Sequence, residues 1–139
     1  MSLVRDAMLT QPGQLPASAS AQAAGELLQR PEVRAVYVTD GERLVGVVTR
    51  KTLVREVVAA GRDPGATPLG EIAEEPHFTI GPDVRLDDAF RFLENEDAER
   101  VPVVDHHHRL VGVLSRSVLQ RRLAEDEDRG DEEPLPPAA

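Results

Sequence analysis

Hydrophobic and polar positions follow one pattern that occurs twice along this chain. In the first half, two short apolar runs flank Asp40-Gly41, a dipeptide that favours the left-handed backbone of a tight hairpin turn. Apolar positions at helical spacing then follow the second run: Leu53, Val54, Val57 and Val58. Gly61 is expected to end this helix, because glycine adopts the left-handed conformation at little cost. The pattern therefore predicts a hairpin followed by a helix.

The second half of the chain repeats the first. The stretches RLVGVVTRKTL (43–53) and RLVGVLSRSVL (109–119) lie 66 residues apart. Residues 34–57 align without a gap on residues 100–123, with ten identities in 24 positions. At the turn, the second copy has His106, His107 and His108. This similarity is too high for unrelated segments and indicates an internal repeat.

Each copy is predicted to run strand, helix, strand, strand, helix. Residues 15–17 and 78–80 are short extended segments, and Ser20 and Asp83 are expected to cap the helices that follow. The apolar faces of these two helices match between copies: Ala21, Ala24 and Leu28 against Leu86, Ala89 and Leu93. The expected fold is α/β (α+β), with two pseudo-symmetric β-α-β-β-α repeats packed as one module.

Changes in composition set the expected boundaries. The first repeat takes residues 1–62, and a linker rich in glycine and proline takes residues 63–68. The second repeat takes residues 69–124. Residues 125–139 combine like charges with three prolines, so we expect an acidic disordered tail that contributes little to stability.

Composition excludes several function classes. The net charge is −9, and seven acidic residues against one arginine after position 124 account for −6 of it. An acidic chain with three Phe, one Tyr and no Trp is poorly suited to bind nucleic acid. Without cysteine there is neither a disulfide framework nor a thiolate metal site, and no apolar run is long enough for a membrane span. We expect a cytoplasmic protein.

The repeated motifs resemble a known family. In each copy an LVGV strand leads from glycine, over two residues, to Thr49 or Ser115, and the pieces VRDAM (4–8) and RVPVVD (100–105) add to the likeness. Together they resemble the tandem cystathionine β-synthase (CBS) domain family, whose paired repeats are called Bateman modules. The resemblance implies a regulatory module that binds adenosine nucleotides or S-adenosylmethionine between its repeats and pairs into a homodimer.

The residues at the strand-to-helix junctions suit an anionic ligand. A helix N-terminus that begins at a hydroxyl residue offers backbone N–H groups and the favourable end of the helix dipole. The resemblance implies that an arginine just before the central strand contacts phosphate, and arginines one residue past the hydroxyls are further candidates. The candidate ligand-binding residues are Arg34, Thr49, Arg50, Thr52, Arg100, Ser115 and Arg116.

One part of the family pattern is missing. The resemblance places Asp or Asn three residues after the hydroxyl, where it accepts hydrogen bonds from ribose, but this chain has Thr52 and Val118 there. Losing such a contact weakens binding by about 1.5–3 kcal/mol. Val118 cannot accept a hydrogen bond, so the site of Thr49 and Thr52 is the better candidate. We expect Thr52 to face the surface and Val118 to be buried.

Structural roles explain several of these residues equally well. Thr49 and Ser115 can simply cap helices, and Arg34 and Arg100 can pair with acidic side chains. The three histidines are interpreted as exposed turn residues, because consecutive residues cannot all converge on one metal ion. The sequence contains no catalytic triad, paired carboxylates or Walker-type loop, so we do not expect an enzyme.

The resulting hypothesis is a stand-alone CBS-pair module, a homodimer, that senses a small anionic ligand and signals to a partner protein. The ligand would be AMP, ADP, ATP or S-adenosylmethionine, with no cofactor required and no nucleic acid or membrane as partner. The alternative is a ligand-free dimerisation or interaction scaffold. A more remote alternative is a protein that completes an active site with a partner's catalytic residues.

Overall fold

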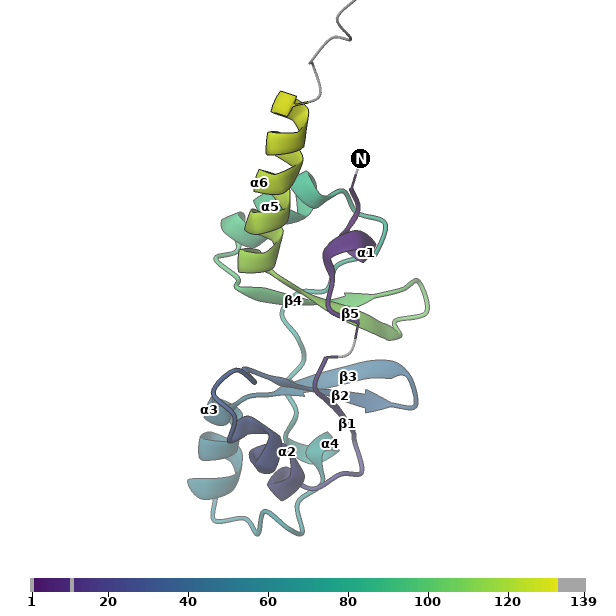
Figure 1. The fold of residues 1–139 in the computed structure, drawn as a ribbon. Helices are drawn as coiled ribbons and strands as arrows, with labels where there is room; N and C mark the ends of the chain where they lie inside the picture. Colours follow the sequence, from purple (N-terminus) through teal and green to yellow (C-terminus); the bar gives the residue numbers. More distant parts are fainter. Residues whose placement is uncertain (1, 11, 133–139) are drawn as a thin grey trace, which may run out of the picture.

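The computed structural model describes residues 2–10 and 12–132, which form two stacked α+β halves (Figure 1). The helices are α1 (Val4–Ala7), α2 (Ala21–Leu28), α3 (Arg50–Leu53), α4 (Leu69–Ile72), α5 (Leu86–Asn95) and α6 (Arg116–Glu132). The strands are β1 (Gln14–Pro16), β2 (Val36–Asp40), β3 (Arg43–Val48), β4 (Arg100–Val104) and β5 (Leu110–Ser115). A π-helical turn over Val54–Val58 continues α3.

Each half is built on a hairpin. β2 pairs antiparallel with β3, and β4 pairs antiparallel with β5. Gly41 has φ +63° at the first turn and His108 has φ +63° at the second, which is the left-handed geometry that such turns require. Both predicted hairpins are therefore confirmed.

The first strand of each repeat differs between the two halves. β1 corresponds to the short extended segment expected over 15–17, and the structure pairs it parallel with β2. In the second half, the expected strand over 78–80 is reduced to one parallel bridge between Ile80 and Val103. The Ile80 N–H donates to Pro102 O at 3.1 Å, and the Val104 N–H donates to Ile80 O at 2.9 Å. The second half thus keeps the pseudo-symmetry with the first, but its first extended segment has fewer paired residues than β1.

The two predicted helix caps have different outcomes. Ser20 caps α2, since its hydroxyl accepts from the Ala23 N–H at 3.1 Å. The prediction for Asp83 is wrong: α5 begins later, after Arg85, and Asp83 forms an ion pair with Arg5. The Leu86 N–H instead donates to Ser2 O at 3.1 Å. A segment more than eighty residues away in sequence therefore supplies the partner that a side-chain cap would have supplied.

The two cores exchange short helices between the sequence repeats. Leu69 and Ile72 of α4 pack in the core of the first half, with α2, β2 and β3. Val4 of α1 packs in the core of the second half, with α5, β4 and β5. Figure 1 shows this exchange, since α1 lies with the later elements and α4 with the earlier ones. The first core therefore reaches past the expected first repeat (1–62) and the linker (63–68) to include α4. The second core reaches back from the expected second repeat (69–124) to include α1.

The two halves form one module because they share a third apolar cluster. It consists of Tyr37 and Leu44 from the first half and Val104 and Val113 from the second. The hairpins also bond to each other, with Leu44 N–H donating to His108 O at 3.0 Å and Leu110 N–H to Glu42 O at 3.0 Å. The expected packing of both repeats as one unit agrees with these contacts.

The helical segment after β3 buries only part of its apolar face. Val57 is buried, but Val54 is 59% exposed and Val58 is 73% exposed. Gly61 ends the helical segment with φ +70°, as expected. Part of the apolar face of this segment is therefore open to solvent.

The last helix runs further than the predicted end at residue 124. α6 continues to Glu132, and the next proline in the sequence is Pro134. The rest of the expected tail, 133–139, lies outside the described residues. Within the described part of the chain, no helix is long and apolar enough to cross a membrane.

Candidate functional site

The two strand-to-helix junctions hold the residues that the sequence singles out. Thr49 precedes α3, and its hydroxyl accepts from the Thr52 N–H at 3.3 Å. Ser115 ends β5, and its hydroxyl accepts from the Val118 N–H at 3.2 Å. The structural role proposed for both hydroxyls, helix capping, is therefore present in the structure. Capping by the same oxygen does not prevent a ligand contact.

The expected exposures of Thr52 and Val118 are wrong. Thr52 is 1% exposed, whereas Val118 is 39% exposed. The hydroxyl of Thr52 accepts from the Thr49 N–H at 3.0 Å and donates to Glu74 Oε1 at 3.2 Å. The position of the missing ribose acceptor is thus enclosed in the first repeat and open in the second.

Glu74 is a residue that sequence reasoning missed. It follows α4 and pairs with β3, where the N–H groups of Val47 and Glu74 donate to each other's carbonyl oxygens at 2.8 and 2.9 Å. This pairing places the Glu74 carboxylate beside Thr52 and in an ion pair with Arg55. Hydrogen bonds to Glu56 and Glu74 raise the pKa of Arg55. No local pattern links residues 22 positions apart, so the sequence carried no signal for this contact.

Arg50 and Arg116 have mainly structural partners. Arg50 donates to Leu28 O at 2.5 Å and to Arg30 O at 2.8 Å, which satisfies carbonyl groups at the end of α2. Arg116 lies 3.6 Å from a Glu99 carboxylate oxygen, at the equivalent place after α5. Both arginines tie the start of a helix to the end of the preceding one, which explains their equivalent positions in the repeats.

Arg34 and Arg100 line one cavity between the repeats. It has a volume of about 450 Å³, and Tyr37 and His77 also line it. Both arginines are exposed, and neither forms an ion pair with any residue in the described ranges. The proposed structural role for these two residues, pairing with Asp or Glu, is therefore not observed.

A second cavity adjoins Arg100 on the side of Ser115. It has a volume of about 330 Å³ and is also lined by Met8, Leu9 and Val118. Arg100 lines both cavities, the first together with Arg34 and the second together with Ser115. Thr49 and Thr52 line neither of these cavities. Arg100 therefore shares one cavity with Arg34 and another with Ser115, while the first-repeat hydroxyls lie outside both.

Comparison with known proteins gives the family of this chain. The family model for the CBS domain matches residues 4–59 and 69–125. The chain belongs to the CBS domain family, as a tandem pair. CBS domain-containing protein YhcV of Bacillus subtilis is 29% identical over 130 residues, which cover 94% of this chain and 91% of YhcV. The predicted family is therefore confirmed.

Solved CBS structures have the same fold. The crystal structure of Hypoxic Response Protein I with two coordinated zinc ions has a TM-score of 0.74, with 25% identity, over 88% of this chain and 99% of that one. The crystal structure of CBSX2 in complex with AMP also has a TM-score of 0.74 and 25% identity, over 91% and 99%. The predicted fold of two CBS repeats is confirmed by this agreement.

The electrostatics of the cavity between the CBS repeats are mixed. Arg34 and Arg100 carry positive charge, while Glu96, Asp97 and Glu99 contribute acidic side chains on one rim. Burial raises the pKa of Tyr37, and the positive charge of Arg100 partly opposes this shift. The Tyr37 hydroxyl therefore stays protonated at neutral pH and keeps its capacity to donate a hydrogen bond.

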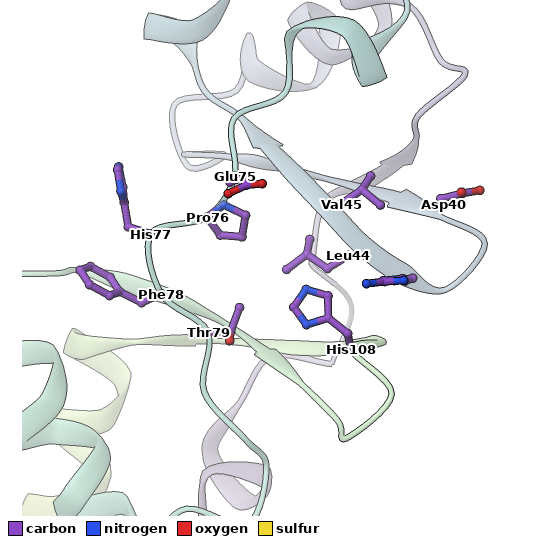
Figure 2. Close-up of a pocket in the computed structure, with 10 residues that line it drawn as sticks. Asp40, Leu44, Val45, Glu75, Pro76, His77, Phe78, Thr79 and His108 are labelled. Carbon is purple, nitrogen blue, oxygen red and sulfur yellow. The ribbon is translucent and has the colours of Figure 1, made fainter.

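A third cavity of about 530 Å³ lies beside the tip of the first CBS hairpin (Figure 2). Figure 2 shows the His108 ring next to Leu44, while His77 points away from it. His106 and His107, in contrast, are exposed. Among residues 2–10 and 12–132, no three His, Cys, Asp or Glu side chains are grouped so that they could hold a metal ion.

Proposed function

We propose that this CBS pair is a regulatory module that senses an adenosine nucleotide and passes the bound state to a partner protein. The observation that carries the proposal is the pair of arginines, Arg34 and Arg100, that line one cavity between the repeats without ion-pair partners among the described residues. Arginine without a carboxylate partner is suited to bind phosphate through its planar guanidinium. The CBSX2 structure with AMP supports the ligand class.

The ligand is proposed to bind beside the second repeat. Arg100 and Ser115 line the same cavity, and α6 begins immediately after Ser115. A phosphate there would meet a guanidinium, a hydroxyl and the N-terminal end of a 17-residue helix, all of which favour negative charge. Arg34, on the adjoining cavity, would contact a second anionic group. This choice differs from the sequence-based preference for Thr49 and Thr52.

Regulation would follow from where the ligand sits. A ligand that contacts Arg100 and Ser115 in the second half and Arg34 in the first would stabilise one relative arrangement of the two halves over others. A partner that binds this arrangement more tightly would then report ligand concentration. The proposed role needs no cofactor and no catalytic step. The exposed side chains of Val54 and Val58 favour homodimerisation. The homodimer would then present the surface to which the regulated protein binds.

A ligand-free scaffold is the second candidate function. Val118 cannot accept hydrogen bonds from a ribose, and this favours a module that has lost nucleotide binding. In this alternative, the CBS pair acts only through its surfaces, by dimerisation or by binding another protein.

Isothermal titration calorimetry separates the two candidates. AMP, ADP, ATP and S-adenosylmethionine are titrated into the wild-type protein, Arg100→Gln and the control Arg91→Gln, which changes an exposed arginine on α5. We expect at least one nucleotide to bind the wild type and Arg91→Gln, with about tenfold weaker binding to Arg100→Gln, because a charged hydrogen bond is worth about 1.5–3 kcal/mol. If none of the four binds at millimolar concentration, the proposal of a nucleotide sensor is wrong, and a scaffold or a ligand without ribose becomes the better account.

A further inference from the structure

We infer that Glu74 is a specificity-determining residue: its carboxylate closes the first repeat to anionic ligands, so each chain takes one nucleotide, beside the second repeat. The inference rests on the proposed function for the identity of the ligand. Hydrogen bonds and charges around Glu74, Thr49 and Thr52 support the closure of the first repeat.

The hydroxyl groups of the first repeat are already used within the protein. The Thr52 hydroxyl donates to Glu74 Oε1 at 3.2 Å, and the two threonine hydroxyls lie 3.1 Å apart. Each threonine has one hydroxyl proton, so when Thr52 donates to Glu74, Thr49 donates to Thr52. This chain of hydrogen bonds ends on the carboxylate. Neither proton is left for a phosphate or a ribose.

The charge at this junction also opposes an anion. A negative carboxylate lies beside the start of α3, in the place where an anionic ligand would otherwise meet the helix N-terminus. Arg55, the cation that contacts this carboxylate, already pairs with Glu74 and with Glu56. An incoming phosphate would therefore face like charge beside the Thr52 hydroxyl.

The equivalent position in the second repeat has no carboxylate. Leu9 pairs with Val113 through two backbone hydrogen bonds of 2.8 and 2.9 Å, as Glu74 pairs with Val47. Leu9 is uncharged, 62% exposed and lines the cavity of Ser115 and Arg100. The Ser115 oxygen accepts from the Val118 N–H, and its own proton has no acceptor among the described residues. The Glu74 carboxylate and the Thr52 hydroxyl that bonds to it therefore distinguish the closed junction from the open one, which has Leu9 and Val118.

Moving the carboxylate to the second repeat tests the inference directly. Leu9→Glu places a carboxylate at the equivalent position, and Leu9→Gln is a neutral control of similar size. Both should fold, because Leu9 is largely exposed. We expect calorimetry to give one AMP per wild-type chain, and at least tenfold weaker binding for Leu9→Glu than for Leu9→Gln. Equal affinity of the two variants would overturn the inference.

The converse experiment removes the charge from the first repeat. Glu74→Gln keeps the size of the side chain, and Glu75→Gln is the matched control on an exposed neighbour. Inorganic pyrophosphate is titrated, and the amide NMR signals of residues 49–53 are followed. We expect these signals to shift in Glu74→Gln and to remain in place in the wild type and Glu75→Gln. The inference is wrong if Glu74→Gln responds no more than Glu75→Gln.

The two experiments separate the inference from the proposed function. If wild-type protein binds no nucleotide, the proposed function fails, while the pyrophosphate comparison still decides the role of Glu74. If wild-type protein binds AMP and the residue 49–53 amides respond to it, nucleotide binding stands and the closure by Glu74 is wrong.

Discussion

Thr52 and Val118 occupy equivalent positions in the two CBS repeats, three residues after a capping hydroxyl. Thr52 lies 1% exposed beneath Glu74, whereas Val118 is 39% exposed and lines a cavity with Arg100. A new carboxylate would therefore meet a negative charge at residue 52 and a positive one at residue 118. The same substitution should have opposite effects at the two positions.

Val118→Asp is expected to strengthen AMP binding by about tenfold, because it restores a charged acceptor for ribose. The variant should fold, since Asp in the first turn of α6 interacts favourably with the helix dipole. Thr52→Asp should instead lower the melting temperature, because it places a second carboxylate in an enclosed site beside Glu74. Calorimetry and thermal melts measure both effects. Equal affinity of Val118→Asp and the wild type for AMP would contradict the prediction.

Asp105 stabilises the turn between β4 and β5. Its carboxylate accepts from the Arg109 N–H at 2.9 Å, from Arg109 Nε at 2.7 Å and from the His107 N–H at 2.9 Å. These hydrogen bonds, that from the Arg109 backbone foremost, lower the pKa of Asp105 from 3.8 to about 2. The ionised form is therefore the one that the folded turn favours.

The contribution of Asp105 to stability should depend on pH. Its pKa is lower in the folded than in the unfolded chain, so its stabilising effect is complete above about pH 4 and is lost as pH falls toward 2. Asp105→Asn should melt at a lower temperature than the wild type at pH 7, and the gap should close between pH 4 and pH 2. A gap that stays constant over this range would contradict the prediction. Thermal melts followed by circular dichroism provide the measurement.

At the scale of elements, close contact between a short segment and a strand recurs in both repeats. The segment after α4 crosses β3 at Gly46, and the segment after α1 crosses β5 at Gly112. A Cβ atom at Gly46 would lie 2.6 Å from the Ala73 Cβ, and one at Gly112 would lie 2.8 Å from Leu9 O. The repeated glycine of the LVGV strands is therefore required by packing.

Gly46→Ala and Gly112→Ala should each destabilise the protein by about 1–3 kcal/mol, as overpacking of a close contact does. Urea unfolding curves measure the change in the free energy of unfolding. Gly13→Ala is the control, because a Cβ there would have its nearest neighbour at 3.8 Å. Comparable stability of Gly46→Ala and Gly13→Ala would show that the segment after α4 shifts without cost. Gly46→Ala should also weaken the hydrogen bond between Thr52 and Glu74, since the new methyl group displaces the segment of Ala73 and Glu74.

At the scale of the whole molecule, the two halves depend on each other. α1 completes the second core and α4 completes the first, while Tyr37, Leu44, Val104 and Val113 fill the space between the sheets. Neither repeat can bury its own core without a segment from the other half of the chain. Unfolding should therefore involve both repeats together.

The proposed homodimer is expected to use the exposed apolar residues Val54 and Val58. Burying a valine side chain contributes about 1.5–3 kcal/mol, so replacing both with glutamate should shift the protein to monomer at micromolar concentration. Sedimentation velocity compares the double variant with wild type and with Gln29→Glu, an added charge on an exposed site elsewhere. A wild type that sediments only as monomer would contradict the homodimer.

Local patterns were sufficient for much of the fold. The two hairpins, the Ser20 cap, the Gly61 stop and the hydroxyl caps at Thr49 and Ser115 all depend on residues within a few positions of each other. Two copies of one pattern also imply two similar halves, which is why the CBS family could be identified from the sequence. Ligand binding, the regulated partner and the homodimer stay predictions.

Only the tertiary structure decided which segments meet across long distances in the chain. It placed the Glu74 carboxylate against Thr52, 22 residues away, where it accepts a hydrogen bond from the Thr52 hydroxyl. It also placed Ser2 against Leu86, so that the Ser2 carbonyl replaces the expected helix cap. It also exposed Val118 and enclosed Thr52, although their sequence contexts are equivalent. Burial and charge at a site depend on its neighbours in space, and a periodic pattern of apolar residues determines only which face a residue occupies on its own element.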